Sequence, residues 1–252
     1  MHVRDVGNLM HNFPLRLRNV LLLLILFAPW GATTQLHSQQ SPQVFLEDFQ
    51  QGLTQHWVER RLASASTRYE VVQEGRNAVL VGRSDRSASI LWRDLDLVPA
   101  EAGTISWRWK VEQAVSPNRR EREKRGDDYA ARLFVVFDPD EFGPSTEAIC
   151  YVWAANEPLG AIYQNPYFDR IGTIVVESGS QRVGEWVAEE RDLIADYWRV
   201  FGKPLEAVTA VAIMVDTDNT SSKATAWFDD ISLVLGDSAS TSPRPTLEQG
   251  GS

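Results

Sequence analysis

Residues 104–111 read Thr-Ile-Ser-Trp-Arg-Trp-Lys-Val, and every second side chain in this stretch is apolar. The alternation has a period of two, which is the repeat of a β-strand with one face in the core and the other toward solvent. Two further stretches, Leu133–Phe137 and Val208–Val215, are apolar at nearly every position. Such runs are typical of central strands that are covered on both faces. The pattern predicts an all-β fold.

Other short apolar segments are separated by Gly, Pro, Asn and Asp, and we expect strands at 44–49, 69–73, 78–83, 88–95, 147–154, 171–177 and 185–190. Many short strands favour a two-sheet antiparallel β-sandwich of jelly-roll or galactose-binding-like type. One short helix is predicted near 191–201, because apolar residues recur there at three- and four-residue spacing before Gly202 and Pro204.

The N-terminal residues resemble an export signal. Arg16 and Arg18 precede the apolar run 20–28, which is shorter than the roughly 20 residues that a membrane span needs. We therefore expect 1–32 to be a signal peptide or an uncleaved anchor, and the protein to be exported, either periplasmic or extracellular. Residues 33–43 are predicted to be a polar linker, 44–235 a single β-sandwich domain, and 236–252 a disordered tail rich in Ser, Thr, Pro and Gly. No transmembrane segment is expected beyond the leader.

Composition excludes several classes of function. The net charge is −9, which disfavours nucleic acid as a partner because phosphate binding needs a basic surface. Cys150 is the single cysteine, so no internal disulfide forms. Of four histidines, only His56 lies inside the predicted domain, which argues against Ser-His-Asp catalysis and against a catalytic zinc site. The nine tryptophans supply core area or ligand platforms.

Two polar clusters are candidates for a ligand site. Each flanks one of the apolar central strands; together they contribute Asp127, Asp128, Arg132, Asp216, Asp218 and Asn219. Arg132 shares a strand face with apolar residues, so its guanidinium must pair with a carboxylate or reach a cleft. A structural ion pair and a binding cleft both satisfy this requirement, and the aspartates are its natural partners.

Aromatic residues supply a second set of candidates: Tyr151 and Trp153 on one strand face, and Asn165 and Tyr167 in a turn. If the face that carries Tyr151 and Trp153 is open, these rings stack against sugars. If it faces the core, they only pack.

The last predicted strand changes parity. Ala224, Ala226 and Phe228 share one face, whereas Ile231 and the alternate residues after it have the opposite parity. A β-bulge at Asp229-Asp230 would point both sets inward.

The first and last strands resemble those of jelly-roll carbohydrate-binding modules, in which such strands often share a structural calcium ion. That resemblance implies Glu47 and Asp229 as calcium ligands, and oxygen ligands suit this hard cation. The alternative is that the aspartates cap a strand end.

Five stretches resemble an uncharacterised family of exported bacterial proteins, domain of unknown function 3047; they are 105–110, 127–132, 151–154, 197–202 and 216–220. Together they span about 45–235. The resemblance implies one exported domain and adds no mechanism.

The sequence favours an exported β-sandwich that binds a carbohydrate or a cell-envelope polymer without catalysis. One alternative is a polysaccharide hydrolase or lyase that uses carboxylates, among them Asp127, Asp128, Asp216 and Asp218, together with Arg132. The other is a structural envelope protein that binds another protein through an exposed apolar patch.

Overall fold

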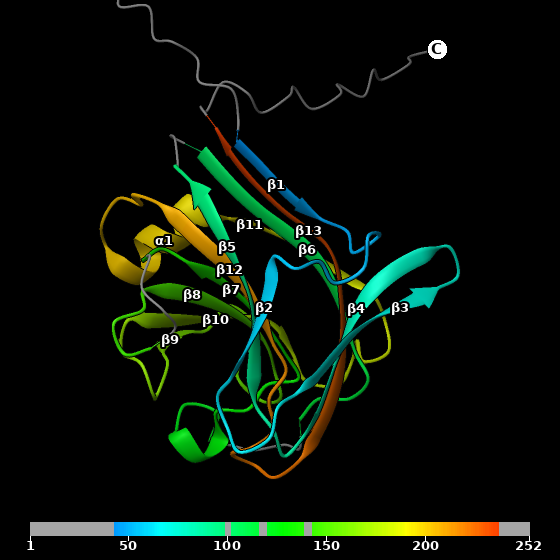
Figure 1. Cartoon of the computed structure of the whole chain (residues 1–252). Helices are drawn as coiled ribbons and strands as arrows, with labels where there is room; N and C mark the ends of the chain where they lie inside the picture. The colour runs from blue at the N-terminus through cyan, green and yellow to red at the C-terminus, as the bar shows by residue number, and fades with distance from the viewer. Residues whose placement is uncertain (1–42, 99–101, 116–119, 139–142, 237–252) are drawn as a thin grey trace, which may run out of the picture. The chain divides into compact units, whose positions relative to one another are not determined.

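The computed structural model describes residues 43–98, 102–115, 120–138 and 143–236. Within them the chain forms two β-sheets that stack face to face, with one α-helix beside them (Figure 1). The predicted all-β sandwich with one short helix is confirmed. The predicted leader at 1–32, most of the linker and nearly all of the C-terminal tail lie outside the described residues. Among the described helices, none has the length and apolar character that crossing a membrane requires.

The first sheet has six strands, and all of its pairings are antiparallel. Its main path runs through β11 (Val187–Asp192), β6 (Ala102–Val111), β13 (Lys223–Gly236), β4 (Asn77–Asp85) and β3 (Arg68–Glu74). The short β1 (Gln43–Glu47) pairs with the second half of β13, so the first and last strands of the domain lie side by side.

The second sheet has seven strands, in the order β2 (Trp57–Arg61), β5 (Ser89–Leu97), β12 (Val208–Met214), β7 (Ala131–Val136), β8 (Ala148–Ala154), β10 (Ile171–Ser178) and β9 (Ile162–Gln164). One pairing differs from the predicted antiparallel pattern: β10 runs parallel to β8. The reason is the intervening β9, which pairs antiparallel with the far edge of β10. The short edge strands β2 and β9 were not predicted, because neither shows a clear alternation.

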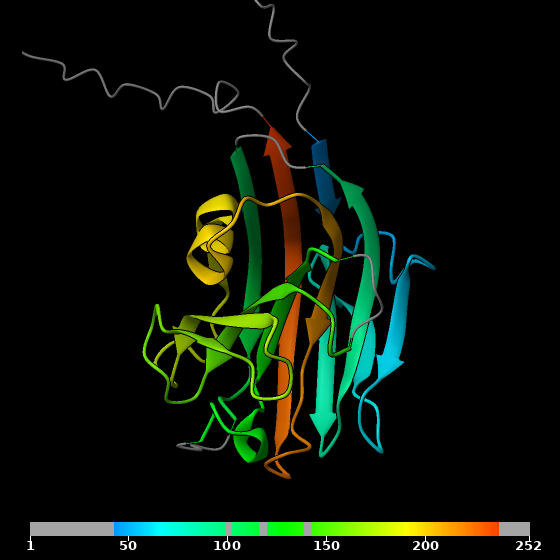
Figure 2. The ribbon, with the colours of Figure 1, turned by 90° about the vertical axis from the view of Figure 1, so that its left-hand side faces the viewer.

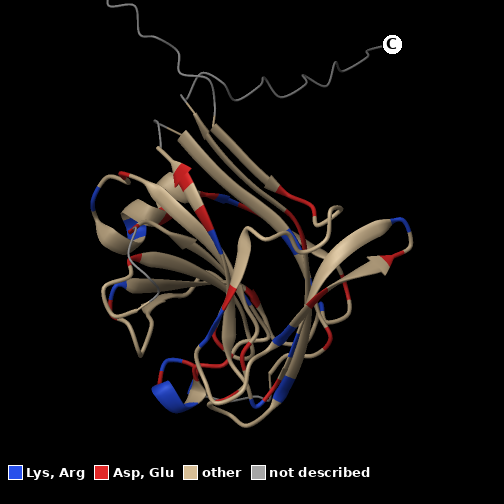
Figure 3. Ribbon diagram, viewed as in Figure 1, with Lys and Arg blue, Asp and Glu red and all other residues tan. Residues whose placement is uncertain are grey.

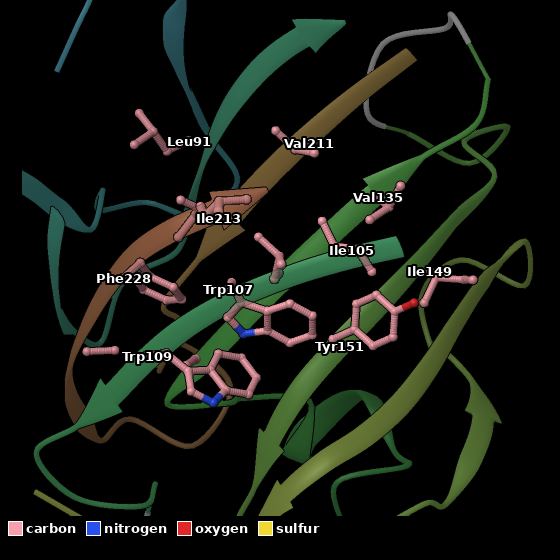
Figure 4. Packing of buried hydrophobic residues seen from close by; sticks show 14 of the residues in the cluster. Leu91, Ile105, Trp107, Trp109, Val135, Ile149, Tyr151, Val211, Ile213 and Phe228 are labelled. Carbon is pink, nitrogen blue, oxygen red and sulfur yellow. The ribbon is translucent and has the colours of Figure 1, made fainter. Parts of the chain in front are cut away.

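The core between the sheets is aromatic. Ile105, Trp107 and Trp109 on β6 are at most 2% exposed, which confirms the predicted period of two. Trp107 contacts Tyr151 of the opposite sheet with ring centroids 5.1 Å apart, and Trp109 meets Trp107 edge to face (Figure 4). These rings join the two layers by burying large apolar surfaces.

The predicted bulge in the last strand is confirmed. The pairing of β13 with β6 shifts register between Asp229 and Ser232, and Asp230 has a φ of 51°. As a result Phe228 and Ile231 both join the core, although their parity differs. The extra residue absorbs the change of phase.

The helix α1 (Leu193–Phe201) packs against β6 and β11, beside one edge of the sandwich (Figure 2). The carboxylate of Asp192 accepts a hydrogen bond from the Ala195 amide and caps the first turn, and Gly202 ends the helix with a φ of 67°.

The outer face of the seven-stranded sheet is apolar as well. β7 is buried at every position and β12 at six of seven, as expected for central strands. Phe134, Cys150 and Ala212 belong to a second apolar cluster on this outer face. Residues from the connecting segments, among them Ala63 and Phe168, pack over it. A hollow remains in this cover, and it is the candidate site.

Candidate functional site

A cavity of about 210 Å³ lies on the outer face of the seven-stranded sheet. We call it the outer-face cavity. One part of its wall is apolar and is formed by Leu62, Ala88, Phe134, Phe168, Ile171 and Met214. The other part is polar and is formed by Asp127, Arg132, Asn165, Tyr167, Asp216, Asp218 and Asn219. Apolar walls with a few converging polar groups are the usual composition of a small-molecule site.

Arg132 forms the centre of the polar wall. It is the second residue of β7, it lies on the same face as Phe134, and it is 2% exposed. Its Nε donates to Asp216 Oδ1 at 2.8 Å, and its Nη2 donates to Asp216 Oδ2. Its Nη1 also donates to Asp127 Oδ1 at 3.3 Å. The guanidinium is therefore compensated by two buried carboxylates, as its place on an apolar face requires.

The loop before β10 is tied to this ion cluster through Asn165. The Asn165 side-chain amide donates to Asp127 Oδ2 at 3.0 Å, and its carbonyl oxygen accepts from the amides of Tyr167 and Phe168. This turn brings the half-exposed Tyr167 ring to the rim of the cavity. The Tyr167 hydroxyl lies 2.5 Å from Asn219 Oδ1, so the two loops on either side of the cavity meet there.

Asp128 holds the loop that follows β12. Its Oδ1 accepts from the backbone and side-chain amides of Asn219 at 3.1 and 3.2 Å, and its Oδ2 accepts from the backbone amide and hydroxyl of Thr220 at 2.6 and 2.5 Å. Asp128 is 1% exposed and does not line the cavity. It therefore positions Asn219 instead of meeting a ligand.

The carboxylates around the cavity lie close together. Asp128, Asp216 and Asp218 each place an oxygen within 4.8 Å of the others. Burial raises the pKa of Asp216, while the adjacent Arg132 guanidinium opposes that rise. Burial, and then the charge of Asp128, raises the pKa of Asp218. Among the described side chains, Asn219 alone donates a hydrogen bond to the Asp218 carboxylate, at a long distance of 3.4 Å. The site is therefore acidic on its polar side.

Seven of the ten predicted ligand residues line the cavity: Asp127, Arg132, Asn165, Tyr167, Asp216, Asp218 and Asn219. Tyr151 and Trp153 lie elsewhere. They are at most 1% exposed and point into the core between the sheets, as the packing alternative predicts. The apolar wall was not predicted, although the shared parity of Phe134 with Arg132 is a signal for it. Other residues of the apolar wall, such as Leu62 and Ala88, come from distant segments, and no sequence pattern marks them as part of a site.

The predicted calcium ligands lie on the other sheet. Glu47 Oε1 accepts from the Phe49 amide at 3.0 Å, and Oε2 accepts from the Trp57 indole at 2.9 Å and pairs with Arg93. Asp229 Oδ2 pairs with Arg108, whereas its buried Oδ1 has no hydrogen-bond partner among the described residues. A shared ion would have to compete with both guanidinium groups, and calcium binding here stays a prediction.

The charged segments near the cavity are of both signs. The basic turn Lys124–Gly126, drawn as a blue coil at the lower left of Figure 3, directly precedes Asp127 and Asp128. Lys124 Nζ lies over the Tyr167 ring at 5.2 Å from its centroid. Basic residues thus reach the outer rim, while the cavity itself contains one guanidinium and three carboxylates.

The hydrolase alternative requires its carboxylates to converge, and they do. Their contacts are those of structural groups, however. Asp127 and Asp216 bind the Arg132 guanidinium, and Asp128 binds loop amides. A general acid or base must reach the substrate, and among these aspartates Asp218 alone is both partly exposed and part of the cavity wall.

Comparison with known proteins gives a family and distant structural likenesses. A family model described as "Protein of unknown function (DUF3047)" matches residues 55–232. No curated protein matches the sequence. Among solved structures, a family 11 carbohydrate-binding module from Clostridium thermocellum is 11% identical at a TM-score of 0.44, and 78% of this chain and 96% of that chain are covered.

The K1 cleaved adhesin domain of Lys-gingipain from Porphyromonas gingivalis is 14% identical at a TM-score of 0.43, with 77% of this chain and 99% of that chain covered. The CBM22-1 xylan-binding domain of Paenibacillus barcinonensis Xyn10C is 15% identical at a TM-score of 0.41, with 79% and 99% covered.

Proposed function

We propose a function for this chain, which belongs to the DUF3047 family of proteins of unknown function. It is an exported, non-catalytic protein that binds a carbohydrate or a cell-envelope polymer in the outer-face cavity. The proposal of export rests on the basic and apolar N-terminal residues. The proposal of glycan binding rests on one observation: a small cavity is lined both by apolar side chains and by three carboxylates.

A sugar ring matches this division. Its C–H face is apolar and its hydroxyl groups donate hydrogen bonds. Phe134, Phe168 and Met214 offer the apolar contact, and the Asp127 and Asp218 carboxylates are acceptors. Tyr167 stands half exposed at the rim, where an aromatic ring stacks on the next part of the ligand. The size of the cavity is below the roughly 300 Å³ of drug-sized pockets, so one sugar ring fills it.

The proposed absence of catalysis follows from the contacts of the carboxylates. Two of the three in the cavity are held by Arg132, so neither is free to transfer a proton. Among the described residues that line the cavity, Asp218 has no second free carboxylate to act with it. Glycoside hydrolysis ordinarily needs a pair.

A glycan-array screen of the full chain, run with and without EDTA, tests the proposal. We expect binding to a defined set of glycans, weakened about 3- to 10-fold by Tyr167→Ala through the loss of one stacking contact of about 0.5–1.5 kcal/mol. Trp198→Ala is the matched control, because Trp198 is an exposed ring on α1 outside this cavity. Binding to no glycan in either condition, or cleavage of the bound glycan, contradicts the proposal.

A further inference from the structure

The outer-face cavity carries an excess of negative charge. Its wall contains three carboxyl groups against one guanidinium, a formal charge of −2 when all three are ionised. Asp128 lies just behind the wall, with an oxygen within 4.8 Å of both Asp216 and Asp218. Charges this close in a partly desolvated site interact strongly, because water screens them less than it does at the surface. A ligand that enters the cavity therefore meets a field that favours positive charge.

The donors in the wall are already engaged. The guanidinium nitrogens of Arg132 donate to Asp127 and Asp216. The side-chain amide of Asn165 donates to Asp127, and that of Asn219 donates to Asp128 and Asp218. The carboxylate of an acidic sugar needs hydrogen-bond donors from the protein. To obtain them it would have to break these contacts, and it would add a further negative charge to the cavity. This argues against uronic acids and other anionic rings as ligands.

Asp218 is the acceptor that stays available. It is half-buried, it lines the cavity, and no guanidinium or ammonium group pairs with it among the described residues. The ammonium group of Lys124 lies over the Tyr167 ring and is itself exposed. Asp218 is thus the one carboxylate of the wall whose charge the protein leaves uncompensated.

A protonated amine supplies what this wall lacks. An ammonium group has donors and no acceptor, and it carries the charge that Asp218 requires. We infer that the cavity selects a sugar ring that bears a free amine over neutral, N-acylated and acidic rings, and that Asp218 is the residue that sets this preference. The inference rests on the proposed glycan binding and names its ligand class.

Four methyl glycosides of one parent sugar test the inference: the 2-amino, the 2-acetamido, the neutral and the uronic acid forms. Each is titrated into the full chain at pH 6 and followed by NMR. We expect the 2-amino glycoside to bind at least tenfold more tightly than the neutral and acetamido forms, and the uronic acid to bind most weakly. The advantage of the amine should shrink as salt is added, because it is electrostatic.

The variant Asp218→Asn should cost the amine about tenfold in affinity and the neutral glycoside much less, because the Asn side chain keeps one acceptor oxygen for a hydroxyl group. Asp96→Asn is the matched control, since it removes one exposed carboxylate at the far end of β5 from the cavity residue Ala88. An unaltered melting temperature of each variant shows that it folds. Equal affinities for the amine and the neutral ring, or tighter binding of the uronic acid, overturn this inference and leave the proposed glycan binding intact. Binding of none of the four overturns both.

Discussion

The Arg132 guanidinium binds Asp216 through both carboxylate oxygens, from β7 to the loop that follows β12, and neither residue is more than 2% exposed. The same guanidinium reaches the side chain and the backbone carbonyl of Asp127. One cation thus joins two loops that lie far apart in the sequence. Because both loops line the outer-face cavity, this ion cluster sets the geometry of its polar wall.

Replacing Arg132 by Met should destabilise the protein strongly. The substitution leaves two carboxylates buried without a cation, which costs about 3–5 kcal/mol. For a domain of this size that loss corresponds to a fall in melting temperature of about 6–20 °C, to be measured by calorimetry. Arg68→Met is the control, because Arg68 pairs with Glu70 at the surface with a side chain that is 75% exposed. An equal, small effect of both variants would contradict a structural role for the cluster.

Removing the Asp128 carboxylate should release the loop after β12. Asp128→Ala deletes an acceptor of four hydrogen bonds from Asn219 and Thr220. Each lost hydrogen bond to a charged group costs about 1.5–3 kcal/mol. If the loss of one such bond determines how easily the loop opens, amide hydrogen exchange at Asn219 and Thr220 should accelerate about 10- to 100-fold. Amides in the distant strand β3 serve as the internal reference. Unchanged exchange at Asn219 and Thr220 would show that Asp128 does not hold this loop.

Stability should depend on the ionisation of Glu189. Burial, and then the charge of Glu177, raises the pKa of Glu189 to about 7 from the usual 4.5. The folded state therefore holds a proton that the unfolded state releases between these values, so the free energy of unfolding falls as pH rises from 4.5 to 7. Glu189→Gln should flatten this part of the profile, measured by urea unfolding at several pH values. Glu190→Gln, an exposed neighbour on β11, should leave the slope as it is.

The predicted calcium site of Glu47 and Asp229 has a direct thermal test. Asp229 Oδ1 is buried and has no hydrogen-bond partner in the part of the chain that the structure describes, and this is the structural feature in favour of an ion. Calcium at about 100 times its Kd would add about 2.7 kcal/mol to the free energy of unfolding. The melting temperature of EDTA-treated protein should then rise on adding calcium, and Asp229→Asn should remove the rise. Equal melting temperatures in EDTA and in calcium would refute the calcium site. Arg93 and Arg108 would then be the cations that neutralise Glu47 and Asp229.

The sequence by itself determined the fold class and the bulge. The alternation of Trp107 and Trp109 with polar neighbours specifies a strand with one buried face, and the slip in parity between Phe228 and Ile231 specifies an inserted residue. These are local rules, because each follows from the period of a single strand. The need of Arg132 for a carboxylate partner was also predictable, since an isolated guanidinium on an apolar strand face is too costly to bury.

The tertiary structure alone decided which residues meet. Tyr151 and Trp153 were candidates for either face of their strand, and the packing of Trp107 and Trp109 against them places both in the core. The cavity draws on segments from Leu62 to Asn219, and its apolar wall depends on loops folding over the outer face of a sheet. Contacts between such distant segments are set by how the sheets stack and by where the connections cross, and the period of a single strand does not encode either.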